Sequence, residues 1–317
     1  MRTLPFALML FSTPVWADAP QVVTDIAPVH SLVAQVMQGV ASPTLLTDQA
    51  SSPHHMQLRP SQVRAIDSAD LVIWVGPSLT PWLERTLNGV SPGATLELLD
   101  VKGTHQRLFM DGHEDHDEHE DHDEHDEHDE HDEHDEHDEH DEHDHGGDAR
   151  DPHAWLDPEN ARIWVAAIAA DLSVIDPQNA QIYQENAAKA DADLATLIAQ
   201  VSTTLSTPSP VVTAHQAYAH FADRFALQVV DHIALGDAAA PSAAHLADLR
   251  AELRQDGVTC VFTEPQLDPG LALIVTEGTG VSVSQLDPLG ATLEIGPDLY
   301  GNLIRALSVA FATCPPL

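Results

Sequence analysis

Strand-like and helix-like patterns alternate along the first part of this chain. A short apolar run at residues 21–24 precedes the segment 28–40, whose apolar residues recur every three or four positions until Gly39. The continuous apolar run 71–76 ends in glycine, a pattern typical of a buried strand in a parallel sheet. This alternation predicts an α/β lobe with a mostly parallel sheet that is flanked by helices.

The same alternation returns in the last third of the chain. Strand-like residues 211–215, 227–235 and 258–266 are each followed by a helical pattern. Between the two regions, residues 176–206 keep a helical pattern with no internal glycine. A helix of this length spans roughly 40 Å and can cross from one lobe to the other.

The predicted architecture is therefore two α/β lobes that are joined by one long rigid helix. Its expected divisions are an N-terminal lobe at 18–176, the linking helix at 177–206 and a C-terminal lobe at 207–317. In open α/β sheets, ligands bind beyond the carboxyl ends of the strands. We expect the functional residues of both lobes at those ends.

Residues 1–17 have the pattern of a secretory signal peptide. Arg2 is followed by the short apolar run 4–11 and by small residues suited to cleavage near Ala17. The run is too short to span a bilayer, which needs about 20 apolar residues. The alternative is a poorly ordered N-terminus of a cytosolic protein, but the pattern favours export.

One acidic, histidine-rich segment dominates the composition. The formal net charge is −38, and residues 111–148 hold 23 acidic side chains with no lysine or arginine, which leaves −15 for the rest. The stretch from His113 to His145 contains only histidine, aspartate and glutamate. Its lack of apolar residues predicts disorder, and its charge argues against nucleic acid and favours cations.

The chain contains two cysteines, Cys260 and Cys314. Export makes a disulfide permissible, and such a bridge would join the C-terminal segment to the second lobe. It could contribute roughly 4 kcal/mol in the chain-entropy model. Two free thiols or a thiolate metal pair are the alternatives, although the wide spacing lacks the C-x-x-C pattern of zinc sites. We favour the disulfide.

Nine of the 21 histidines lie outside the acidic segment. Three of them stand where a strand or a stiff loop ends: His54 follows residues 43–47, His153 lies between two prolines, and His215 ends an apolar strand. Three histidines with one oxygen form a common zinc site. Asp287 could supply that oxygen, or could instead stabilise a turn before proline. We favour ordinary structural roles for His30, His220, His232 and His245, while His105, beside the acidic segment, is ambiguous.

Several motifs, in their order and spacing, resemble one family of transport receptors. They are HHMQLRPSQVRAIDSADLVIWVG, DPHAWLDP, VVTAHQAYAHFADRF, CVFTEPQ and LDPLG. Together they resemble the zinc-specific periplasmic solute-binding proteins that serve ABC importers, the cluster A-I group whose lobes are joined by one rigid helix. The resemblance covers essentially the whole chain after the signal peptide.

The resemblance implies a set of metal ligands. The histidine four residues before the leucine of "LRPS" is His54 rather than His55, and the second and third ligands correspond to His153 and His215. Manganese-selective relatives usually have glutamate at the third position, so His215 indicates Zn²⁺, and a manganese receptor is the weaker alternative. The fourth ligand is either Asp287 or water.

The resemblance also implies partners and a location. It indicates a monomeric periplasmic protein that is not an enzyme and that passes zinc to a cognate ABC permease in the inner membrane. A periplasmic zinc chaperone is a further expected partner. The family's disulfide corresponds to Cys260 and Cys314. Relatives often carry a histidine-rich loop before the second ligand, which predicts that residues 111–148 collect or sense zinc at weaker sites.

Two other functions fit part of the pattern. A periplasmic zinc buffer or sensor would bind metal at the same residues without delivering it. A zinc hydrolase would use three histidines and an open coordination position. The chain has no H-E-x-x-H motif and no glutamate beside the expected ligands that could act as a general base, so we disfavour the hydrolase.

Overall fold

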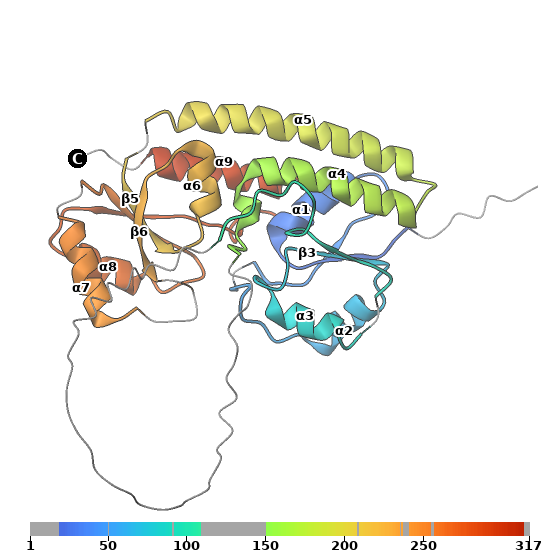
Figure 1. Cartoon of the computed structure of the whole chain (residues 1–317), viewed down its shortest axis with the longest axis horizontal. Helices are drawn as coiled ribbons and strands as arrows, with labels where there is room; N and C mark the ends of the chain where they lie inside the picture. Colours follow the sequence, from blue (N-terminus) through green and yellow to red (C-terminus); the bar gives the residue numbers. More distant parts are fainter. Residues whose placement is uncertain are drawn as a thin grey trace, which may run out of the picture.

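The computed structural model describes residues 19–49, 51–90, 92–108, 150–207, 209–234, 236, 241–254 and 257–313. The predicted signal peptide at 1–17 and the acidic segment at 111–148 lie outside the described residues. Within the described ranges the chain forms two α/β lobes beneath one long helix (Figure 1). In this part of the protein, no helix is both long enough and apolar enough to cross a bilayer.

The N-terminal lobe contains a four-stranded sheet in the order β2-β1-β3-β4, and all neighbouring strands are parallel. β3 is central and all four of its residues are buried, as the apolar run 71–76 predicts. The elements of this lobe are β1 (Val22–Thr24), α1 (Ala27–Val36), β2 (Thr44–Leu45), α2 (Pro60–Asp67), β3 (Leu71–Trp74), α3 (Pro81–Leu87) and β4 (Thr95–Glu97).

The C-terminal lobe repeats this plan with a parallel sheet in the order β6-β5-β7-β8. The two central strands, β5 and β7, are buried along their whole length. The elements of this lobe are β5 (Val211–His215), α6 (Ala219–Phe225), β6 (Val229–Ala234), α7 (Ala243–Glu252), β7 (Cys260–Thr263), α8 (Gly270–Thr276) and β8 (Ser282–Gln285).

The remaining helices connect the lobes. The short 3₁₀ helix η1 (Ala154–Leu156) leads into α4 (Pro158–Ile175), and α5 (Ala180–Thr204) then runs along both lobes (Figure 1). The last helix, α9 (Leu299–Ala312), belongs to the predicted C-terminal lobe but also packs against α1 and α5. One buried apolar core includes side chains from both sheets and from these helices. The prediction of two parallel-sheet lobes joined by a long helix is therefore confirmed.

The predicted disulfide lies partly within the described residues. Cys260 begins β7, is buried and is disulfide-bonded. Cys314, its predicted partner, lies outside the described residues. The predicted bond between Cys260 and Cys314 would attach the segment that follows α9 to β7, a central strand of the second sheet.

Candidate metal centre

Three of the predicted histidines meet between the two lobes. His54 comes from the loop after β2, His153 directly precedes η1, and His215 is the last residue of β5. One nitrogen of each imidazole lies within 4.8 Å of the others, and no other metal-binding group of this kind occurs within the described ranges. The ring centroids of His54 and His215 lie 5.6 Å and 5.3 Å from that of His153. The fold thus brings together residues that are far apart in the sequence.

A buried carboxylate orients the ring of His153. Oδ1 of Asp151 lies 2.7 Å from Nδ1 of His153 and accepts a hydrogen bond from its main-chain N–H at 3.0 Å. Burial alone would raise the pKa of Asp151, but the hydrogen bonds and the nearby ring of His153 lower it below its ordinary value. The ionised carboxylate favours the tautomer with a proton on Nδ1, in which Nε2 is the nitrogen that could coordinate a metal.

His215 has an equivalent partner in its own lobe. Oε1 of Glu264, which follows β7, lies 2.9 Å from Nδ1 of His215, and both side chains are buried. A carboxylate at Nδ1 again leaves coordination to Nε2. The two carboxylates were not assigned from the sequence, although Asp151 stands only two residues before His153 and Glu264 lies in the quoted motif CVFTEPQ.

The loop of His54 is held by different contacts. The indole N–H of Trp82 donates a hydrogen bond of 2.7 Å to the carbonyl of Pro53, and the main-chain N–H of His54 donates to Oγ of Ser52 at 3.2 Å. Burial and the neighbouring His153 and His215 rings lower the pKa of His54 to about 3. The ring is therefore neutral near pH 7, as a metal ligand must be.

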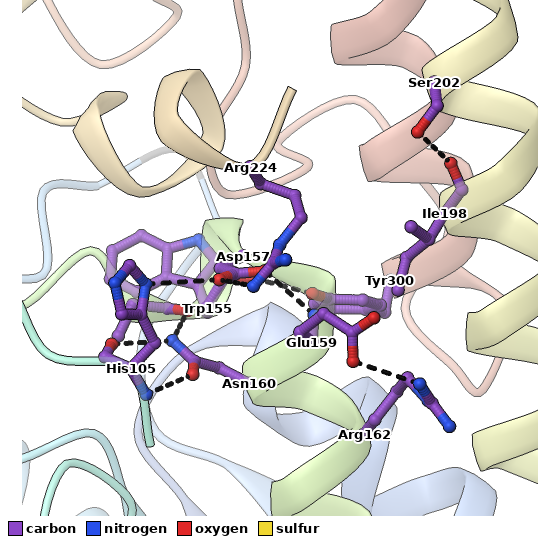
Figure 2. Close-up of polar contacts among 11 residues, drawn as sticks. His105, Trp155, Asp157, Glu159, Asn160, Arg162, Ile198, Ser202, Arg224 and Tyr300 are labelled. Atoms are coloured by element: carbon purple, nitrogen blue, oxygen red, sulfur yellow. Dashed lines mark hydrogen bonds and ion pairs between the residues drawn. The ribbon is translucent and has the colours of Figure 1, made fainter. Parts of the chain in front are cut away.

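A second group of polar contacts fixes the segment that carries His153 (Figure 2). Asp157 is buried at the N-terminus of α4, where its side chain accepts a hydrogen bond from the main-chain N–H of Glu159 at 2.9 Å. Arg224 of α6 donates two hydrogen bonds to this carboxylate, at 2.7 and 2.8 Å. Asn160 joins the start of α4 to the main chain of His105. These contacts attach the His153 segment to both lobes.

The predicted fourth residue lies outside the histidine cluster. Within the described residues, Asp287 does not belong to the group of ligand atoms that surrounds the site. Its two oxygens accept hydrogen bonds from the main-chain N–H groups of Leu289 and Thr292, both at 3.3 Å. These contacts match the turn-stabilising role that the sequence left open for Asp287, and its role as a ligand stays a prediction.

The other histidines have separate structural contacts. His30 is buried and its Nε2 lies 3.2 Å from the carbonyl of Pro43. His245 contacts the carbonyl of His232 through Nε2 at 2.9 Å, and the His220 ring is fully buried beside Asp151. None of these four rings lies in the cluster formed by the described residues. The side chain of His105 is half exposed, and its Nδ1 lies 3.5 Å from Oδ2 of Asp157.

The arrangement suits one small metal ion. The three imidazoles line a cavity of about 20 Å³, enough for roughly one water-sized sphere. Imidazole nitrogen is a preferred ligand of zinc, and three histidines leave one of four tetrahedral positions for another donor. The carboxylates of Asp151 and Glu264 provide the outer contacts that metal-bound histidines usually have.

Comparisons with known proteins relate this chain to zinc-uptake proteins. Residues 22–314 match the family model described as "Zinc-uptake complex component A periplasmic". The "High-affinity zinc uptake system protein ZnuA" of Paracoccus denitrificans is 47% identical over 316 residues, covering 98% of this chain and 96% of that protein. The protein of the same description from Brucella abortus is 40% identical over 305 residues, covering 93% and 91%.

Solved structures show the same fold at low identity. A crystal structure of ZnuA aligns with a TM-score of 0.73 at 20% identity, covering 94% of this chain and 99% of that one. A zinc-bound deletion mutant of ZnuA aligns with a TM-score of 0.74 at 21% identity, covering 95% and 99%. With the matched family model and the identity to full-length relatives, these findings show that the chain belongs to the family of the periplasmic component A of zinc-uptake complexes.

Proposed function

We propose that this protein is a periplasmic receptor that captures Zn²⁺ at His54, His153 and His215 and delivers it to a cognate ABC permease. The observation that carries this proposal is the cluster itself, in which three imidazole nitrogens from two lobes lie within 4.8 Å of one another. Its relatives carry the name of a high-affinity zinc uptake protein. The family consists of substrate-binding receptors, and the chain is not an enzyme.

The acidic segment has an accessory role in this proposal. The residues on either side of it meet: Leu108 and Arg150 form an antiparallel bridge, and the main-chain N–H of Asp151 donates to the carbonyl of Arg107 at 2.8 Å. The segment 111–148 is therefore attached close to Asp151 and His153. Its 12 histidines would collect or sense zinc there at weaker, interchangeable sites.

Metal titration tests the site directly. A protein without residues 111–148 should bind one Zn²⁺ tightly in competition with a chelator, and Mn²⁺ more weakly. The binding free energy of a zinc site with four ligands is about 10–16 kcal/mol. Because His153→Gln or His215→Gln removes one of these ligands, each should weaken zinc binding by roughly two orders of magnitude. His55→Gln is the matched control, because His55 is exposed beside His54 and lies outside the cluster. Tight binding by both cluster variants would refute the assignment.

Growth distinguishes a receptor from a zinc buffer or sensor. Cells that lack this protein should grow poorly in zinc-depleted medium, and the wild-type protein should restore their growth. His153→Gln should fail to do so even when it is exported in normal amounts. A wild-type protein that binds zinc tightly but does not restore growth would support the buffer and would contradict delivery to a permease.

A further inference from the structure

In the loop that carries His54, the side chain of Gln49 contacts the opposite lobe. Its amide Nε2 donates to the carbonyl of Gly290 at 2.7 Å and to the carbonyl of Leu293 at 3.2 Å. These acceptors are more than 240 residues away in the sequence. Gln49 stands five residues before His54, so this contact joins a ligand-bearing loop of the N-terminal lobe to the C-terminal lobe.

A second glutamine makes the reciprocal contact. Nε2 of Gln266 donates to the main-chain carbonyl of Gln49 at 3.3 Å. Gln266 lines the same cavity as the three histidines and follows Glu264, the partner of His215, by two residues. The hydrogen bond between these two glutamines therefore joins the loop of His54 to the segment that carries Glu264.

The loop that accepts Gln49 is also fixed near His153. The indole N–H of Trp155 donates to the carbonyl of Pro288 at 2.9 Å, and the Trp155 and His153 rings lie 5.2 Å apart. Asp287 stabilises the turn that contains Gly290 through the main chain. Gln49 consequently contacts a loop whose position is already set by the segment of His153.

The chemistry of these contacts requires an amide at position 49. A glutamine NH₂ group has two N–H donors, and Gln49 directs them to two carbonyl acceptors. A glutamate of the same shape has acceptors only, so it would lose both bonds and would face two carbonyl oxygens. Two other contacts of this loop, Trp82 with Pro53 and Arg59 with Asp48, lie within the N-terminal lobe.

We propose that Gln49, together with Gln266, is a positioning residue that ties the His54 loop to the C-terminal lobe and slows the release of bound zinc. This role rests on the proposed function, because it requires Zn²⁺ at the three histidines. Release requires His54 to move away from the other two ligands, and that movement must break the contacts of Gln49 first. In this proposal zinc enters while the loop is open and the contacts of Gln49 form afterwards, so the effect falls on dissociation.

Stopped-flow release of Zn²⁺ into excess chelator tests this role in the full chain. Gln49→Glu should raise the rate of the slowest release phase roughly 5- to 30-fold, as expected for the loss of two hydrogen bonds. The association rate should change less than about twofold. Gln49→Ala, which adds no charge, should accelerate release in the same direction.

Gln35→Glu is the matched control. Nε2 of Gln35, in α1, donates to the carbonyl of Pro297 at 2.9 Å, which is the same kind of bond between the N-terminal lobe and the segment before α9. Gln35 does not line the histidine cavity, so its variant should release zinc at the wild-type rate. Equal acceleration by Gln35→Glu would overturn the role of Gln49, because any contact between these regions would then have the same effect.

The remaining outcomes separate this role from the proposed function. If the wild-type protein binds one zinc tightly while Gln49→Glu and Gln49→Ala release it at the wild-type rate, the positioning role is wrong and the receptor stands. If the wild-type protein has no tight zinc site, the proposed function fails, and the positioning role fails with it.

Discussion

His153 and His215 are supported differently from His54. Each of the first two rings has a buried carboxylate at Nδ1, from Asp151 and Glu264. For the imidazole of His54, no hydrogen bond is found among the described residues, and its loop is held through main-chain carbonyls. Two ligands are thus fixed by ionic partners, whereas the third depends on the position of its loop.

We expect this difference to give the three histidines different roles, with His153 and His215 setting the affinity for zinc and His54 its exchange. The carboxylates hold the His153 and His215 rings in one orientation and one tautomer before the metal arrives, which favours tight binding. The His54 loop can be displaced without uncovering a buried charge, because its Gln49 and Gln266 bonds to the opposite lobe are between neutral groups and its Arg59–Asp48 ion pair is exposed. We therefore expect His54 to be the first of the three proposed ligands to leave.

The largest effect should come from the support of the His153 segment. Arg224→Met leaves the buried carboxylate of Asp157 without its cationic partner, and we expect a loss of about 3 kcal/mol in the free energy of unfolding. Arg59→Met, the control in the His54 loop, breaks an exposed ion pair with Asp48 and should cost less than about 1 kcal/mol. Urea unfolding of the metal-free proteins measures both values. Similar losses for the two variants would contradict the comparison.

The next effect concerns the two carboxylates. Asp151→Asn and Glu264→Gln keep the size of each side chain but remove its charge, and each should weaken zinc binding about 10- to 100-fold. Ser52→Ala removes the hydroxyl that accepts from the main chain of His54 and should change the affinity less than about fivefold, because that hydrogen bond is neutral. Chelator competition gives all three affinities. An equally large loss for Ser52→Ala would show that the loop is as finely positioned as the other two ligands.

A pH series isolates the electrostatics of His54. Its folded pKa of about 3 lies below the ordinary histidine value near 6.5, so below pH 6.5 the unfolded chain binds a proton that the folded protein excludes. His54 therefore destabilises the metal-free protein progressively as the pH falls from about 6.5 to about 3. At pH 5.5 this amounts to about 1.4 kcal/mol.

His54→Gln removes this contribution. Compared with wild type, the variant should gain stability between pH 7.5 and pH 5.5 in chemical unfolding without metal. Burial also lowers the pKa values of His30, His220 and His232, but both proteins contain these residues, so their effects cancel in the difference. A difference between the proteins that stays constant with pH would show that His54 is not held neutral by its surroundings.

The order of elements and the convergence of His54, His153 and His215 could be predicted because their signals are local. The run 71–76 is apolar throughout and becomes the central strand β3, and the uninterrupted helical pattern at 176–206 becomes α5. His153 stands between prolines, and His215 ends a strand. Strand ends of parallel sheets meet at one edge, so residues at these positions converge even without information on distance.

The supports of the site could not be predicted in the same way. Glu264 is 49 residues from His215, and Gln266 is 217 residues from Gln49, so a single sequence contains no local signal that pairs them. Asp151 is the exception, because a carboxylate two residues before a candidate ligand satisfies the usual pairing of metal-bound histidine with an acid. The sequence does not decide between a turn role and a ligand role for Asp287, because aspartates at strand ends serve both purposes.

The smallest effect should come from Asp287. In the structure its oxygens accept two long main-chain hydrogen bonds, and Asn keeps one acceptor for them. Asp287→Asn should therefore change zinc affinity less than about threefold, with water as the fourth ligand. If Asp287 instead coordinates zinc, the substitution removes the anionic ligand and the affinity should fall by roughly two orders of magnitude. A chelator competition separates the two outcomes well.

Asp268→Asn controls for the loss of one surface charge, because Asp268 is exposed and accepts a hydrogen bond from the main-chain N–H of Gly270 in its own turn. A large loss of affinity in Asp287→Asn alone would mean that the C-terminal lobe supplies a charged ligand. His54 would then be still more clearly the ligand that exchanges.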